Sequence, residues 1–147
     1  MLSAHDVARY FLSLTDEEAG DAISNLKLQK LLYYAQGFNL ALSAEPLFNE
    51  TLEAWTHGPV VPDIYHQYKE RGGAAIPPPM EFDSSGIDER TREFLDEIYN
   101  IYGQYSAWKL VNMTHAERPW QDAYNKPEDR TISTDVMKDY FLTLVSQ

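Results

Sequence analysis

The chain has 147 residues, of which 44% are hydrophobic and 24% charged. Domains commonly run to about 100–150 residues, and this composition is typical of a folded chain, so it excludes disorder throughout. Twelve basic residues against 23 acidic ones give a formal net charge of −11. That charge repels phosphate backbones and would attract a basic protein, so we expect no nucleic-acid partner.

Cysteine is absent from the sequence. This excludes disulfides, zinc–thiolate sites and cysteine nucleophiles, and it fits a reducing cytoplasm, where we expect the protein to reside. No apolar run approaches the 18 or so residues of a membrane helix, and no signal peptide is visible. We therefore expect no membrane association.

The first predicted helix begins at Ser3, which forms a capping-box-like pair with Asp6. Apolar residues follow at helical spacing, and we expect the acidic segment Thr15-Asp16-Glu17-Glu18 and then Gly20 to end the helix. A second helix is predicted at about residues 24–43, from a cap at Ser24 or Asn25. Its apolar stripe consists of Leu28, Leu31, Leu32, Ala35, Phe38 and Leu42.

Two further stripes of the second helix are more polar. One carries Gln29, Tyr33 and Gln36, and the other, opposite the apolar stripe, carries Lys27, Lys30 and Tyr34. Because more than half of its circumference is apolar, we expect this helix to be central and contacted from several sides.

A short β element is predicted near residues 48–56, where apolar and polar residues alternate. His57-Gly58-Pro59 predicts a turn, and Pro62 starts a short helix that ends at Gly72-Gly73. Residues 74–86 form a proline-rich connector.

Helix is predicted again from Ile87 and from Ser106, a loop from Thr114 to Trp120 with a new helical turn at Pro119, and a final helix from Ser133. The expected fold is mainly α: one compact helical domain over residues 1–147, around a central helix, with a small β element. No separate DNA-binding domain is expected.

None of the common phosphate-binding, zinc-protease or serine-hydrolase motifs occurs in the sequence. We therefore expect no catalytic residue, metal or cofactor. A small hydrolase or metal enzyme built on His57, His66 or His115 stays as a third hypothesis, after the two given below.

Three segments in order resemble the Panacea domain family of SocA-like antitoxins. They are Asn25-Leu26-Lys27-Leu28-Gln29-Lys30-Leu31-Leu32-Tyr33-Tyr34-Ala35-Gln36-Gly37, then Phe48-x-Glu50-x-x-x-Ala54-Trp55-x-x-Gly58-Pro59-Val60, then Thr114-His115-x-x-x-Pro119-Trp120-x-x-Ala123. Each block alone is moderately specific, and the three together span about 100 of the 147 residues.

The resemblance implies an antitoxin of a toxin–antitoxin system, encoded beside its toxin in bacterial, prophage or phage genomes. It would neutralise the cognate toxin by direct protein–protein binding, without catalysis. The alternative implied by the family is an adaptor that delivers a toxin or other client to a ClpXP-type protease. The family does not identify the toxin.

Five residues are the expected partner-binding set: Lys27, Lys30, Tyr34, Trp55 and His57. We expect structural roles for the remaining signature residues, which are Leu28, Gln29, Leu31, Leu32, Tyr33, Gln36, Gly58, Pro59, Thr114, His115, Pro119 and Trp120. The segment 81–97, with seven acids and two arginines, is a candidate surface for a basic toxin.

Overall fold

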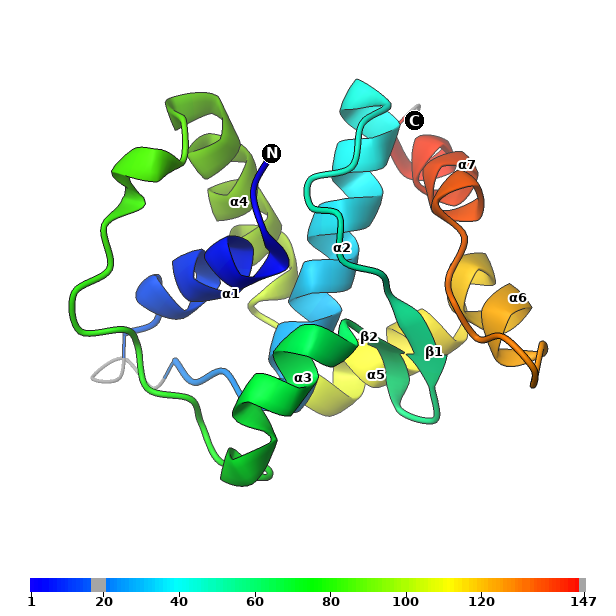
Figure 1. Ribbon diagram of the computed structural model, residues 1–147, viewed down its shortest axis with the longest axis horizontal. Coiled ribbons are helices and arrows are strands. Elements are labelled where there is room, and N and C mark those ends of the chain that lie inside the picture. The colour runs from blue at the N-terminus through cyan, green and yellow to red at the C-terminus, as the bar shows by residue number, and fades with distance from the viewer. Residues whose placement is uncertain (17–20, 146–147) are drawn as a thin grey trace.

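The structure is a computed structural model that describes residues 1–16 and 21–145. Helices dominate it, as Figure 1 shows, and the predicted mainly-α fold with a small β element is confirmed. In chain order the elements are α1 (Ala4–Ser13), α2 (Asn25–Ser43), β1 (Glu53–Trp55), β2 (Gly58–Val60), α3 (Pro62–Tyr68), η2 (Lys69–Arg71), η3 (Ser84–Gly86), α4 (Glu89–Tyr102), α5 (Ala107–His115), α6 (Arg118–Tyr124) and α7 (Thr134–Val145).

Helix α1 begins as its sequence predicts. The Ser3 hydroxyl accepts from the Asp6 amide at 3.0 Å, and the Asp6 carboxylate accepts from the Ser3 amide at 3.1 Å. This reciprocal pair satisfies two amides that the first helical turn would leave without partners. The helix ends at Ser13, and Gly20 and the acids at 17 and 18, expected to end it, lie outside the described residues.

Helix α2 is the centre of the fold, as predicted. It contacts α1, α3, α4, α5, α7 and β2, which surround it in Figure 1. Every residue from Leu28 to Gly37 is buried. Burial is no longer continuous after Gly37, and Leu42 is 63% exposed although its spacing predicts a buried position. Leu40, outside the predicted stripe, is buried instead.

The β element is a two-stranded hairpin, shorter than the predicted strand near 48–56. Strand β1 pairs antiparallel with β2, with Trp55 opposite Gly58 and Glu53 opposite Val60. The turn predicted at His57-Gly58-Pro59 is displaced: His57 lies in the turn at residues 56–57, whereas Gly58 and Pro59 belong to β2. Gly58 has a φ of +104°, which residues with a side chain rarely adopt.

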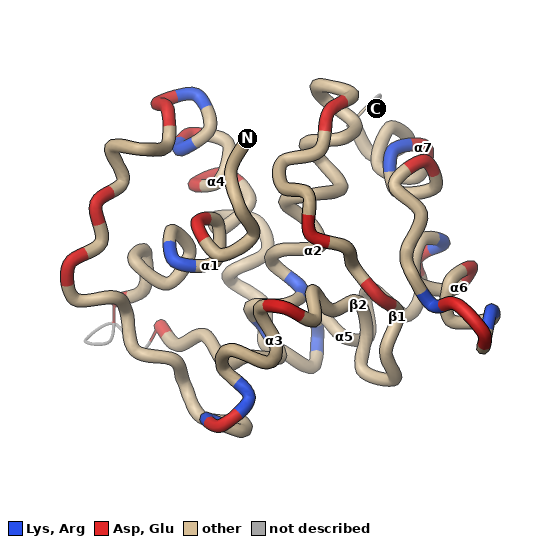
Figure 2. The backbone as a smooth tube through the Cα atoms, viewed as in Figure 1, with Lys and Arg blue, Asp and Glu red and all other residues tan. Residues whose placement is uncertain are grey.

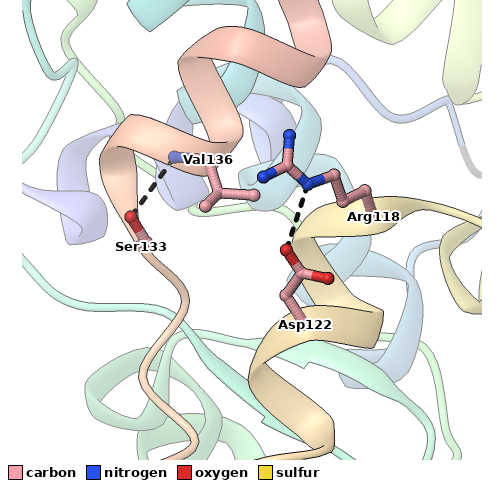
Figure 3. Close-up of polar contacts among 4 residues, drawn as sticks. All are labelled: Arg118, Asp122, Ser133 and Val136. Carbon is pink, nitrogen blue, oxygen red and sulfur yellow. Dashed lines mark hydrogen bonds and ion pairs between the residues drawn. The ribbon is translucent and has the colours of Figure 1, made fainter.

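Polar side chains cap the later helices. Ser106 accepts from the Lys109 amide at the start of α5, and Ser133 accepts from the Val136 amide at the start of α7, at 3.1 and 3.2 Å. Figure 3 shows the Ser133 cap beside the exposed Arg118–Asp122 ion pair of α6, whose atoms lie 3.0 Å apart. Both predicted helix starts are confirmed.

The predicted loop from Thr114 to Trp120 is mostly helical. Thr114 and His115 complete α5, and α6 begins at Arg118 with Pro119 in its first turn. Only residues 116–117 link the two helices. Within the described part of the chain, no helix has the length and apolar character needed to cross a bilayer.

Candidate partner-binding groove

Two glutamines of α2 hold the chain on either side of the hairpin. Gln29 and Gln36 are seven residues apart, two helical turns, so their side chains share one face. The Gln29 side chain donates to Asn25 and accepts from the Val61 amide at 2.9 Å. The Gln36 side chain accepts from and donates to the backbone of residues 47–48, at 2.7 and 2.8 Å. Both side chains are buried, so their predicted structural role is supported by direct contacts.

Lys30 lies beneath the hairpin rather than on an exposed stripe. Its side chain has no exposed surface, and Nζ donates to the Pro59 carbonyl at 3.1 Å. A Cβ at Gly58 would lie 2.6 Å from the Lys30 Cε, so the lysine stem fills the space that this glycine leaves. Burial lowers the pKa of Lys30 to about 7. The expected surface position of Lys30 is therefore wrong.

Tyr34 is also interior, contrary to its expected surface position. The hydroxyls of Tyr33 and Tyr34 donate to the two carboxylate oxygens of Glu117, each at 2.9 Å. Both rings are fully buried, and Tyr34 stacks on Tyr102 with centroids 3.9 Å apart. Burial raises the pKa of Glu117 to about 7, although the hydroxyls of Tyr34, Tyr33 and Tyr140 oppose this rise. Residues of α2 thus anchor the α5–α6 link.

The third sequence block fixes the hairpin turn from the outside. The His115 Nε2 lies 2.9 Å from the Thr56 carbonyl oxygen, and the Trp120 Nε1 donates to the Trp55 carbonyl at 2.8 Å. Thr114 is buried, and its hydroxyl donates to the Val111 carbonyl. These contacts favour packing roles for Thr114, His115 and Trp120, in line with the sequence expectation.

The hairpin held in this way forms one wall of a surface groove of about 560 Å³. Its other walls come from the start of α2, from α3 and from η2. The lining residues are Asn25, Leu26, Gln29, Glu53, Ala54, Trp55, Thr56, His57, Val60, Tyr65, Lys69, Gly72 and Arg130. Trp55 packs edge-on against Tyr65 at 4.9 Å between centroids, and its Nε1 donates to the Glu53 carboxylate.

One rim of the groove carries an exposed aromatic pair. His57 packs edge-on against Trp108 of α5, with ring centroids 5.1 Å apart. Trp108 is 57% exposed, and His57 is exposed as well. Tryptophan side chains are enriched at the centres of protein interfaces.

Three of the five expected partner-binding residues thus remain accessible. Trp55 and His57 line the groove, whereas Lys27 is half-buried outside it, and its Nζ donates to the Gly103 carbonyl at 2.6 Å. The sequence interpretation missed Trp108 and Glu117. Trp108 sits in a mixed apolar run that predicts burial, and Glu117 occupies an unassigned position of the third block.

Among residues 1–16 and 21–145, no group of three or more histidine or acidic side chains is arranged to hold a metal ion. The three histidines of the enzyme hypothesis each pack against an aromatic ring: His57 on Trp108, His66 near Trp55, and His115 on Trp120.

A helical domain in which a few buried polar side chains hold an apolar groove with an exposed aromatic pair beside it has the surface features of a protein-binding module. The profile of the family described as antitoxin SocA-like, Panacea domain, matches residues 28–121. The chain is 35% identical over 135 residues to "Antitoxin SocA" of Caulobacter vibrioides (strain NA1000 / CB15N), covering 81% of this chain and 72% of that protein. No solved structure matches. The chain therefore belongs to the SocA-like Panacea family, and both matches support an antitoxin role.

Proposed function

We propose that this protein neutralises a cognate toxin by binding it directly, without catalysis, and that the groove beside the hairpin contacts the toxin. Family membership supports the antitoxin role. The choice of this surface rests on Trp108, whose side chain is 57% exposed at the edge of the groove, where it packs against His57. A cytoplasmic location and a toxin encoded by the neighbouring gene belong to the same proposal.

The groove offers the chemistry that a protein interface needs. Its lining combines the aromatic side chains of Trp55 and Tyr65 with the charged residues Glu53, Lys69 and Arg130. Interfaces commonly combine an apolar centre with a polar rim, and tryptophan is among their strongest contributors. The contact set is thus Trp55, His57 and Trp108, while Lys30 supports the hairpin from inside and Tyr34 supports the α5–α6 link.

Co-expression with the product of the adjacent gene tests this proposal. The neighbour alone should arrest growth, and this protein should restore growth and co-purify with the neighbour at a fixed ratio. A harmless neighbour, or rescue without any complex, would contradict direct neutralisation. The control is a truncated, non-toxic form of the neighbour. With this form, cells should grow equally well with and without this protein.

The half-life of the toxin in the cell distinguishes direct binding from the adaptor alternative. If the protein neutralises the toxin simply by staying bound to it, the half-life of the toxin in the cell is unchanged or lengthened when this protein is present. If it delivers the toxin to a ClpXP-type protease, the half-life shortens and rescue fails in a strain that lacks the protease. The second result would replace direct neutralisation by the adaptor function.

A further inference from the structure

A second cavity, separate from the groove, lies between α1, α3 and the proline-rich connector. Its volume is about 380 Å³. His5 and Arg9 of α1 line it with Tyr68, Arg71 and the prolines at 77–79. None of these residues lines the groove beside the hairpin. We call this cavity the α1–α3 pocket.

The α1–α3 pocket is basic in a protein that is strongly acidic. Two guanidinium groups and an imidazole line it, and no acid is among its lining residues in the described chain. Neither Arg9 nor Arg71 lies within 4.0 Å of a carboxylate oxygen of any described residue. Figure 2 shows basic segments on α1 and just after α3 among many more acidic ones. Although the sequence has 23 acids, these two arginines form no ion pair with a described carboxylate, and such guanidinium groups can bind an anion.

Tyr68 lines the pocket together with both arginines. Burial raises the pKa of its hydroxyl, and the charges of Arg9 and Arg71 oppose this rise. Arg9 is also held over the Phe82 ring, with Cζ 5.5 Å from the centroid, which orients its planar group.

His5 adds a donor that nothing in the described structure uses. Its Nδ1 is buried without a hydrogen-bond partner among the described residues. His5 precedes Arg9 by four residues, so the two side chains lie on one face of α1. His5 therefore contributes a polar side chain to the lining beside Arg9.

We propose that the α1–α3 pocket binds the phosphate group of a small phosphorylated molecule. Two guanidinium forks match the double charge and planar oxygen pairs of a phosphate monoester better than a single carboxylate. The cavity is far larger than a phosphate ion, and Leu12, Ile76 and the proline rings give it apolar walls for the organic part. The prolines fix the backbone of this wall. Because proline has no backbone N–H, the wall has no amide donors that need hydrogen-bond partners.

Calorimetric titration of the full chain with ribose 5-phosphate at low salt tests the proposal. We expect saturable binding at one site that weakens by about tenfold or more in Arg9→Gln and in Arg71→Gln. Lys69→Gln is the matched control, since Lys69 is exposed on the same short turn as Arg71 but lines the other groove. It should change affinity by less than about twofold.

Inorganic phosphate and acetate are the comparison probes. Tighter binding of ribose 5-phosphate than of either ion supports the proposal. Equal binding of inorganic phosphate would reassign the pocket to a free anion, and equal binding of acetate would reassign it to a carboxylate. Absence of saturable binding, or equal losses in all three charge variants, would overturn the site. None of these results bears on toxin neutralisation, which the α1–α3 pocket does not enter.

Discussion

Two ionisable side chains in the interior, Lys30 and Glu117, are the least expected residues of this protein. Each is buried, each belongs to the family-matched segment, and each is held by groups that lie far away in the sequence. Glu117 accepts from tyrosines 83 and 84 positions away, and Lys30 donates to a carbonyl 29 positions away. The polar signature of α2 therefore fixes tertiary contacts, and the exposed chemistry is carried by the elements that it supports.

Glu117 gives stability a defined pH dependence. Its pKa is raised from 4.5 to about 7 in the folded protein, mainly by burial. The folded state then holds a proton that the unfolded state has lost, so the stabilisation is complete below pH 4.5 and is lost as pH rises through 7. The size of the effect is on the order of 3 kcal/mol.

Urea unfolding of the wild type and of Glu117→Gln across this range measures that loss. The difference in unfolding free energy between the two should change steadily from pH 4.5 to 7 and stay constant above it. A constant difference over the whole range would show that Glu117 titrates normally and is not enclosed as described.

The pH dependence of stability that Lys30 contributes has the opposite sign. Its pKa is lowered from 10.5 to about 7 by burial, so its contribution is complete above pH 10.5 and is lost as pH falls through 7. Lys30→Met keeps the length of the apolar stem and removes the charge, so it should stabilise the protein most below pH 7. Thermal unfolding at pH 6 and pH 9 tests this, and equal effects at both pH values would contradict it.

At the scale of elements, the packing of α7 on α2 depends on Gly37. A Cβ at this position would lie 2.2 Å from the Phe141 ring, so no side chain fits unless α7 moves. Alanine is favoured over glycine in a helix by up to about 1 kcal/mol, whereas overpacking a core costs about 1–3 kcal/mol. The overlap is severe, so the second effect should win.

Once the helix-propensity gain is subtracted from an overpacking cost near the upper end of its range, Gly37→Ala should lower the unfolding free energy by about 2 kcal/mol. Gly86→Ala is the matched control, because a Cβ at Gly86 meets no atom within 4 Å. It should stay within about 0.5 kcal/mol of the wild type. A Gly37→Ala variant as stable as the wild type would mean that α2 and α7 lie further apart than the structure has them.

Element starts were predictable because their signals are local. Ser24, Ser106 and Ser133 each accept from an amide three residues further on, and such short-range caps are visible in any sequence. The burial of Lys30 and Tyr34 could not be predicted, because the helical pattern of the sequence assigns both residues to a polar side of α2. What buries them is the hairpin and Glu117, which only the tertiary fold brings to that side of α2.

At the scale of the whole molecule, the net charge of −11 should govern how fast a partner arrives. Glu89, Glu93 and Glu97 are exposed at four-residue spacing on α4, so they form one acidic stripe. If the toxin is basic, its association rate constant should fall by about tenfold from 50 to 500 mM salt. Replacing all three glutamates by glutamine should flatten this dependence, as stopped-flow measurement would show. A rate constant independent of salt in both proteins would contradict electrostatic steering.

The central claim is that a toxin binds the groove beside the hairpin, and the dissociation constant of the purified complex tests it most directly. Trp108→Ala should weaken binding by about tenfold or more, because a large exposed aromatic side chain is lost from the interface. Leu42→Ala removes a side chain that is 63% exposed at the end of α2 and should leave affinity within about twofold. Both variants should retain the wild-type helical circular dichroism. Unchanged affinity in Trp108→Ala, or an equal loss in Leu42→Ala, would place the toxin elsewhere on the molecule.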